Sequence, residues 1–187
     1  MSSSALLKTR MKAFEFLAWA DAQSQGRFEL VGGEVVAMAP ERARHNLVKL
    51  AVARALADAV KAARLPCTVF TDGMAVVINE DTVREPDAAV QCGSGQDLNA
   101  MAIDAPLIVV EVTSPSSERD DTGAKLVEYF SVASIRHYLI VRPEQNAVVH
   151  HRKDESGEIH TRIANEGDIM LAPPGLTVAV ARLLAHD

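Results

Sequence analysis

The chain has 187 residues and a formal net charge of −6 at pH 7, and aromatic residues make up only 4% of it. This length suffices for one domain over residues 1–187 with a core of Val, Leu, Ile and Ala, and we expect its first residues, 1–10, to be flexible. The negative charge argues against a broad electrostatic grip on nucleic acid, although it is compatible with a local basic surface. No apolar run approaches the roughly 20 residues of a membrane span, so we expect a cytoplasmic protein without membrane contact.

Two compositional features bear on function without deciding it. Residues 41–64 contain six basic and two acidic residues, a pattern typical either of a solvated helix face or of a local surface for nucleic acid. The two cysteines, Cys67 and Cys92, are too few for a disulfide framework or a zinc site. We expect both to be reduced thiols, as is usual in the cytoplasm.

Hydrophobic periodicity predicts three helices and several strands. Two β-like runs flank Gly32-Gly33, which predicts a hairpin, and Pro40 and Pro66 bound the longest helical pattern. Residues 107–112 form an uninterrupted apolar run, typical of a central strand covered on both faces. In chain order, the expected elements are a helix over 11–22, the hairpin over 27–38, a helix over 41–64, a β-like run over 68–78 that is interrupted at Asp72-Gly73, strands over 87–91 and 107–112, a helix over 117–133, a strand over 135–141, a hairpin over 147–163 and a strand over 176–180.

The same periodicity predicts which helix faces are buried. In the first helix, Phe14, Leu17 and Ala18 lie at helical spacing. The third helix is expected to begin at Ser117, which together with Asp120 resembles a capping box. The apolar stripe of the second helix consists of Leu47, Val48, Ala51, Val52, Ala55 and Ala59.

This order of elements predicts an α/β or mixed α+β domain with a mixed sheet and few helices. The strand–helix–strand segment over residues 107–141 is expected to form a right-handed crossover.

Two carboxylates at strand ends indicate the chemistry of the protein. Asp87 precedes a short apolar run and Glu111 closes another, where a charge without a partner is costly to bury. If the two strands are neighbours, the carboxylates approach each other, and each raises the pKa of the other. A divalent cation removes this repulsion, and Mg²⁺ suits the site because it prefers oxygen ligands.

A lysine on the following helix completes the candidate site. Lys125 could lean over the sheet toward Glu111 and stabilise the charge that develops on a phosphate during hydrolysis. Alternatively, it forms a surface pair with Asp121, which lies one helical turn before it; Tyr129 follows one turn later on the same face. The sequence leaves both interpretations open.

Four stretches together resemble a known family. Pro86-Asp87 followed by Glu111-Val112 resembles the PD-(D/E)xK nuclease superfamily, and the chain is more narrowly similar to the Uma-type family of restriction endonucleases. The resemblance covers roughly residues 12–152 and implies a restriction-endonuclease-like central mixed β-sheet flanked by helices. The stretches that carry it are residues 28–35, 84–87, 109–116 and 125–129.

The resemblance also implies roles for individual residues. Asp87 and Glu111 would bind Mg²⁺ or Mn²⁺, with the main-chain carbonyl of Val112 as a third ligand. Glu29 matches the position of an additional acidic site residue. His45, at the start of the long helix, could reach the same site or be a surface or capping residue.

One position departs from the superfamily pattern. The superfamily places its lysine two residues after the second acid, where this chain has Thr113. The Uma-type family supplies the lysine from the following helix, which makes Lys125 the corresponding residue. The catalytic set implied for this chain is therefore Asp87, Glu111, Lys125 and Glu29.

Three histidines are weaker candidates for a metal site. His150 and His151 are adjacent, so on a strand their side chains point to opposite faces. Together with His160 they suggest either a metal site or ordinary surface histidines of a hairpin.

The leading hypothesis is a metal-dependent endonuclease that hydrolyses phosphodiester bonds, with DNA as the expected substrate. The alternative is a nuclease-like module that no longer cuts and serves in binding or assembly. The acidic charge and the lack of an aromatic stacking platform favour this alternative. We expect a homodimer, since most soluble oligomers have two-fold symmetry.

Overall fold

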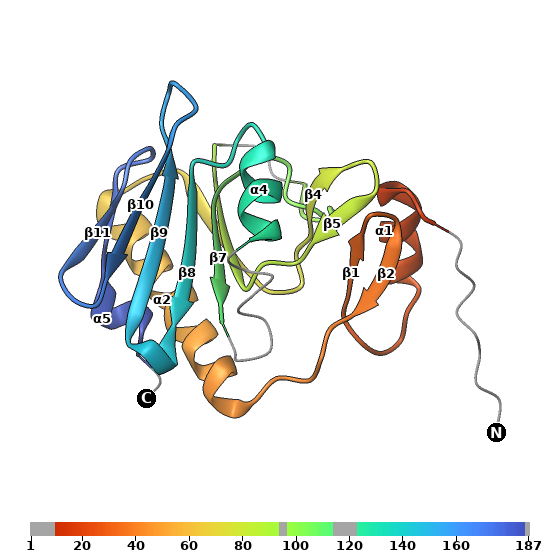
Figure 1. The fold of residues 1–187 in the computed structure, drawn as a ribbon, viewed down its shortest axis with the longest axis horizontal. Helices are drawn as coiled ribbons and strands as arrows, with labels where there is room; N and C mark the ends of the chain where they lie inside the picture. Colours follow the sequence, from red (N-terminus) through yellow and green to blue (C-terminus); the bar gives the residue numbers. More distant parts are fainter. Residues whose placement is uncertain (1–9, 94–96, 114–122, 186–187) are drawn as a thin grey trace.

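The computed structural model describes residues 10–93, 97–113 and 123–185. Within them the chain forms a six-stranded mixed sheet, a four-stranded antiparallel sheet and a separate two-stranded hairpin, with helices packed around them (Figure 1). The helices are α1 (Ala13–Asp21), α2 (Ala43–Ala63), α4 (Ala124–Ser131) and α5 (Val180–Leu183), and a 3-10 turn, η1, spans Pro143–Gln145. This arrangement confirms the expected fold class.

The six-stranded sheet has the order β10-β9-β8-β7-β6-β3. Its only parallel pair among the described strands is β7 and β8, which confirms that the segment over residues 107–141 crosses over between parallel strands. The strands are β3 (Cys67–Thr71), β6 (Ala88–Cys92), β7 (Pro106–Val112), β8 (His137–Arg142), β9 (Ala147–Lys153) and β10 (Ile159–Ala164). The predicted start of the crossover helix at Ser117, with its capping box, lies outside the described residues.

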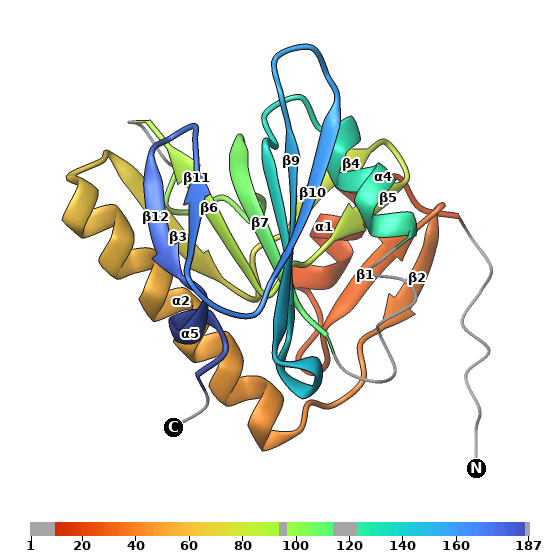
Figure 2. The same ribbon diagram turned by 60° about the vertical axis from the view of Figure 1, so that its left-hand side comes forward.

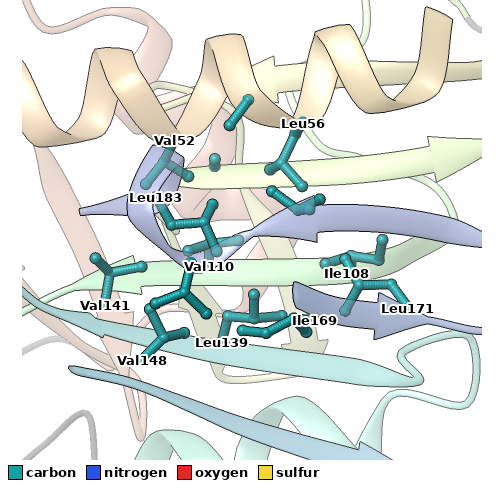
Figure 3. Close-up of a cluster of buried hydrophobic side chains, with 14 of the residues drawn as sticks. Val52, Leu56, Ile108, Val110, Leu139, Val141, Val148, Ile169, Leu171 and Leu183 are labelled. Atoms are coloured by element: carbon teal, nitrogen blue, oxygen red, sulfur yellow. The ribbon is translucent and has the colours of Figure 1, made fainter. Parts of the chain in front are cut away.

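Strand β7 is buried on both faces, as its apolar run predicts. Alternate residues contribute to two different cores: Ile108 and Val110 belong to one, and Val109 belongs to the other. The first core lies between the sheet and α2, with α5 and the separate hairpin on the same side (Figures 2 and 3). The second core lies under α4, where Tyr129 packs on the sheet.

The smaller sheet, of order β2-β1-β5-β4, lies beside the larger one and is covered by α1 (Figure 1). Gly32 and Gly33 form its predicted hairpin turn, and both have positive φ angles, of 56° and 82°, which favour glycine. Its strands are β1 (Phe28–Val31), β2 (Glu34–Ala37), β4 (Val76–Asn79) and β5 (Thr82–Arg84). The separate hairpin consists of β11 (Asp168–Leu171) and β12 (Leu176–Ala179).

Several local predictions differ from the structure. The run over residues 68–78 is interrupted at Asp72-Gly73 as predicted, where Gly73 has a φ angle of 99°, but its two halves belong to two different sheets. Phe14 is 72% exposed, whereas Phe16 is buried, because α1 faces the small sheet with Ala13 and Phe16. In α2, Val48, Val52 and Ala55 are buried as expected, but Leu47 is 45% exposed.

The expectation of reduced thiols is wrong. Cys67 and Cys92 are opposite one another on the paired strands β3 and β6, their Cα atoms are 3.9 Å apart, and their sulfur atoms form a disulfide. Their separation of 25 positions in the sequence gave no sign of this, because strand pairing alone brings the two positions together. In the described parts of the chain, no helix combines the length and the apolar character needed to cross a membrane.

The two adjacent histidines on β9 point to opposite faces of the sheet, as predicted. His151 Nδ1 lies 2.8 Å from the Thr161 hydroxyl, whereas His150 Nε2 lies 2.9 Å from His137 Nδ1. The other ring nitrogen of His137 lies 2.7 Å from the Pro173 carbonyl, so His137 donates to Pro173 and accepts from His150. Burial, helped by the positive charge of Arg152, lowers the pKa of both His137 and His150 to about 4.

These two histidines should make the protein sensitive to mild acid. Their pKa values in the folded state lie below the unfolded value of about 6.5, so the stability they contribute is complete above that pH and is lost as the pH falls toward 4. We expect the free energy of unfolding, measured by urea denaturation, to fall by roughly 2 kcal/mol between pH 7 and pH 5. His137→Gln should reduce this fall, and an unchanged pH slope in this variant would contradict the assignment.

Candidate active site

Antiparallel pairing of β6 and β7 sets the two predicted acidic positions opposite each other. Ala88 pairs with Val110, and the next position along the ladder puts Asp87 beside Glu111. Both side chains are buried, with exposed fractions of 5% and 4%. The prediction that the two acids come from neighbouring strands is therefore confirmed.

Glu111 is held from α4. Its Oε1 accepts hydrogen bonds from Lys125 Nζ at 2.9 Å and from the Tyr129 hydroxyl at 2.6 Å. The two donors are one helical turn apart, so a single helix face supplies both. Burial and then the negative charge of Glu111 raise the pKa of Tyr129 well above its usual value, so the phenol stays protonated and keeps donating.

Lys125 is itself buried, with an exposed fraction of 7%, and lies 3.6 Å from Glu29 in addition to Glu111. The interpretation of Lys125 as part of an exposed surface pair is therefore wrong. Asp121, its suggested partner in such a pair, lies outside the described residues.

Asp87 is held from the strand beside it and from the start of α2. Its Oδ2 accepts a hydrogen bond from the Val112 backbone N–H at 2.6 Å and lies 3.8 Å from His45 Nε2, while its Oδ1 lies 3.1 Å from Lys49 Nζ. Burial alone would raise the pKa of Asp87, but the hydrogen bond with His45, the charge of Lys49 and the Val112 N–H outweigh it and lower that pKa. The buried carboxylate is thus kept ionised.

The sequence analysis missed Lys49. This lysine is only 4% exposed, and besides Asp87 it donates to Glu41 at 2.5 Å and to Asp72 at 2.7 Å. Burial lowers the pKa of Lys49, but the attraction of Asp87 and the two further hydrogen bonds raise it above its usual value. The position of Lys49 in the helix indicated its burial, because it precedes the buried residues Val52 and Ala53 by three and four positions and so lies on the same helix face.

Glu29, on β1, joins the site from the small sheet. It accepts from Arg84 Nη1 at 2.8 Å and from the Glu85 backbone N–H at 3.2 Å. Arg84 also makes a two-pronged pair with Glu128 of α4, with distances of 2.6 and 2.9 Å. The guanidinium therefore ties the small sheet to the helix that carries Lys125.

The site contains more negative than positive charge. Among the described residues, seven carboxylates and four cationic side chains connect through these contacts, which leaves a formal excess of three negative charges with His45 neutral. The carboxylates are Glu29, Glu41, Asp72, Glu85, Asp87, Glu111 and Glu128, and the cations are Arg27, Lys49, Arg84 and Lys125. An oxygen-rich site with excess negative charge fits a hard divalent cation.

Comparison with known proteins agrees with this geometry. Residues 13–184 match the Uma2 family, whose description is "Putative restriction endonuclease". The chain belongs to the Uma2 family.

Two relatives extend this finding. The Uma2 chain is 23% identical to the uncharacterized protein slr1290 of Synechocystis over 168 residues, which cover 89% of this chain and 87% of the relative. Its fold resembles the crystal structure of a putative nuclease belonging to DUF820 from Anabaena variabilis, with a TM-score of 0.72 and 18% identity. That match covers 93% of this chain and 97% of the Anabaena chain, so the two proteins share essentially the whole fold.

Two groups of described residues in this Uma2 protein have ligand atoms close enough together to hold a metal ion. In the first, ligand atoms of Glu41, His45 and Asp87 all lie within 4.8 Å of one another. The second consists of Asp154, Glu158 and His160 on the β9–β10 hairpin, but there Asp154 already accepts hydrogen bonds from the backbone of its own turn. Of this first group, Asp87 and His45 were candidates from the sequence and Glu41 was not, while Glu111 is not among its members.

Lys49 should be needed for stability as well as for the charge of Asp87. Lys49→Met would leave three carboxylates without their shared cation, and we expect a loss of about 3 kcal/mol in unfolding free energy at pH 7. Urea denaturation would measure it, with Lys61→Met, at an exposed position on the same helix, as the matched control. Equal stability of the two variants would show that the buried contacts of Lys49 contribute nothing.

Proposed function

We propose that this Uma2 protein is a metal-dependent endonuclease that hydrolyses phosphodiester bonds, with DNA as its substrate. The observation that carries the proposal is the pairing of Asp87 with Glu111 at adjacent strand positions, each beside a buried lysine. Buried carboxylates in this number are costly for a fold, and a role in binding a cation and a phosphate accounts for them.

In this proposal Asp87 and Glu111 hold Mg²⁺ or Mn²⁺, with the main-chain carbonyl of Val112 as a further ligand and His45 and Glu29 beside them. The N–H of Val112 fixes Asp87, which supports placing the carbonyl of the same residue near the site. The cation would neutralise phosphate charge and promote ionisation of an attacking water. Lys49 keeps Asp87 ionised, and Tyr129 positions Glu111.

Lys125 would carry the positive charge that stabilises the phosphate during hydrolysis. Thr113, at the position of the superfamily lysine, is buried, and its hydroxyl donates to the Val141 carbonyl at 3.3 Å. A lysine supplied from α4 therefore replaces the missing one. In this role Lys125 would exchange part of its contact with Glu111 for the phosphate.

A cleavage assay with purified variants tests these roles. Wild type should cut single- or double-stranded DNA in the presence of Mg²⁺ or Mn²⁺, and Asp87→Asn, Glu111→Gln and Lys125→Met should each reduce the rate by at least about 100-fold. Lys61→Met serves as the control for removing one exposed lysine, and RNA is included as a second substrate. Equal cleavage by wild type and the site variants would show that the activity arises elsewhere or from a contaminant.

Metal binding separates the endonuclease from the alternative, a module that no longer cuts. The two short lysine–carboxylate contacts favour that alternative, because the lysines already neutralise the acids without a metal ion. Titration calorimetry with Mn²⁺ should show a site that Asp87→Asn and Glu111→Gln weaken but Lys125→Met retains. Undetectable binding in the wild type, together with no cleavage, would favour the inactive module.

Assembly and location remain predictions of the sequence. A homodimer would suit cleavage of both strands, and light scattering coupled to size-exclusion chromatography should give about twice the chain mass. The single domain over residues 1–187 is likewise proposed, and one cooperative unfolding transition is expected from it. The disulfide between Cys67 and Cys92 weighs against the expected cytoplasmic location, because disulfides persist mainly in oxidising compartments.

A further inference from the structure

A group of arginine and histidine side chains lies on the other half of the large sheet. The pairing of β8, β9 and β10 sets Arg152 between His137 and His160, and it sets His150 opposite Arg162. Because these positions alternate along each strand, all five side chains point to one face of the sheet. It is the face of the core under α2, since Leu139, which pairs with His150, belongs to that core.

This group is remote from the candidate active site. His137 pairs with Ile108 near the start of β7, whereas Glu111 lies three residues further along the same strand. Arg152 and Arg162 lie one and two strands beyond β8, so strand spacings place them on the order of 15 Å from Glu111. A ligand bound here therefore contacts residues other than Asp87 and Glu111.

The surface over these strands is hollowed. A cavity of about 330 Å³ is lined by His150, Arg152, His160, Thr161, Arg162, Met170 and Ala172. A second cavity, of about 440 Å³, shares Arg152 and Ala172 with the first and adds two cations, Arg136 and Lys153, and two acids, Asp154 and Glu155. We call the two together the β8–β10 groove.

The first cavity has no carboxylate in its lining, in a protein whose net charge is −6. Within the described ranges, no ion pair joins Arg136, Arg152 or Arg162 to an acid, although Arg136 and Arg162 donate to the backbone carbonyls of Asp154 and Asp168. The acid nearest to the group, Asp154, pairs with His160. The positive charge of the arginines is therefore available to a ligand.

The chemistry of these groups selects an anion over a metal. Arginines repel a cation. Burial is the main cause of the lowered pKa of His150, and the neighbouring histidines and arginines lower this pKa further, which agrees with a positive local potential. Guanidinium groups match the geometry of phosphate oxygens, and the size of the cavity suits a phosphate group with its attached sugar.

We propose that the β8–β10 groove binds a backbone phosphate of nucleic acid, with Arg152 and Arg162 as its main contacts and His160 at the rim. This inference takes the nucleic-acid substrate from the preceding proposal. It adds an anchor for the strand at a distance from the bond that is cut. Phosphate contacts of this kind position a nucleic acid without reading its sequence, so the groove contributes affinity and register.

Binding without cleavage tests the groove directly. Fluorescence anisotropy of a labelled single-stranded oligodeoxynucleotide, with EDTA present and over a series of salt concentrations, compares wild type with Arg152→Gln/Arg162→Gln. We expect roughly tenfold weaker binding and a salt dependence reduced by about 1.4 in log–log slope, as for two lost phosphate contacts. The matched control is Arg54→Gln/Lys61→Gln, which removes two exposed charges from α2.

A second arm uses inorganic phosphate alone, titrated by calorimetry into the same three proteins. Weaker oligonucleotide binding confined to the groove variant supports the inference, whereas equal losses in both double variants would reduce it to a general charge effect and overturn it. If the groove variant loses phosphate binding but keeps its affinity for the oligonucleotide, the groove is a site for free phosphate. This result would also overturn the inference. Because EDTA suppresses the metal chemistry, an inactive protein can still pass this test and an active nuclease can still fail it.

Discussion

The candidate site depends on the register between β6 and β7. Pairing Ala88 with Val110 puts Asp87 next to Glu111, and it also lets the Val112 N–H donate to Asp87. A shift by one residue would move every side chain of β6 to the opposite face and separate the acids. The apolar cores on the two faces of β7 oppose such a shift, so the packing that stabilises the fold also fixes the site.

Two buried lysines make the site compatible with folding. Lys49 approaches Asp87 from α2, and Lys125 approaches Glu111 from α4, so each acid is matched from a helix on a different face of the sheet. Breaking such a pair costs more than the pair contributes, because the remaining charge stays buried. Both helices are therefore coupled to the same strand ends by charge as well as by apolar packing.

The large sheet thus carries two different electrostatic environments. At the ends of β6 and β7 the linked side chains have excess negative charge, whereas the first cavity of the β8–β10 groove is lined by arginines and histidines without a carboxylate. The proposed function would use both environments, with a metal ion and a phosphate at the acidic site and basic groups at the neighbouring phosphates. The net charge of −6 for the whole chain does not reveal this separation.

The sequence by itself determined the general fold and most of the acidic site. Periodicity located the glycine hairpin, helix α2 and the doubly buried strand β7, because these features depend on near neighbours along the chain. The order of motifs identified Asp87, Glu111 and Lys125 as a group before any contact was known. Family membership and the shared fold agree with the family and the fold that these motifs indicate.

Only the tertiary structure decided the features that depend on pairing between distant segments. Lys49 looked like one more charge of a basic helix until its burial beside Asp87 was known. The disulfide and the row of Arg152 with His160 arise from strand register, which no local pattern specifies. A sequence records which side chains are present, but their partners, and hence their charge and chemistry, follow from which strands lie side by side.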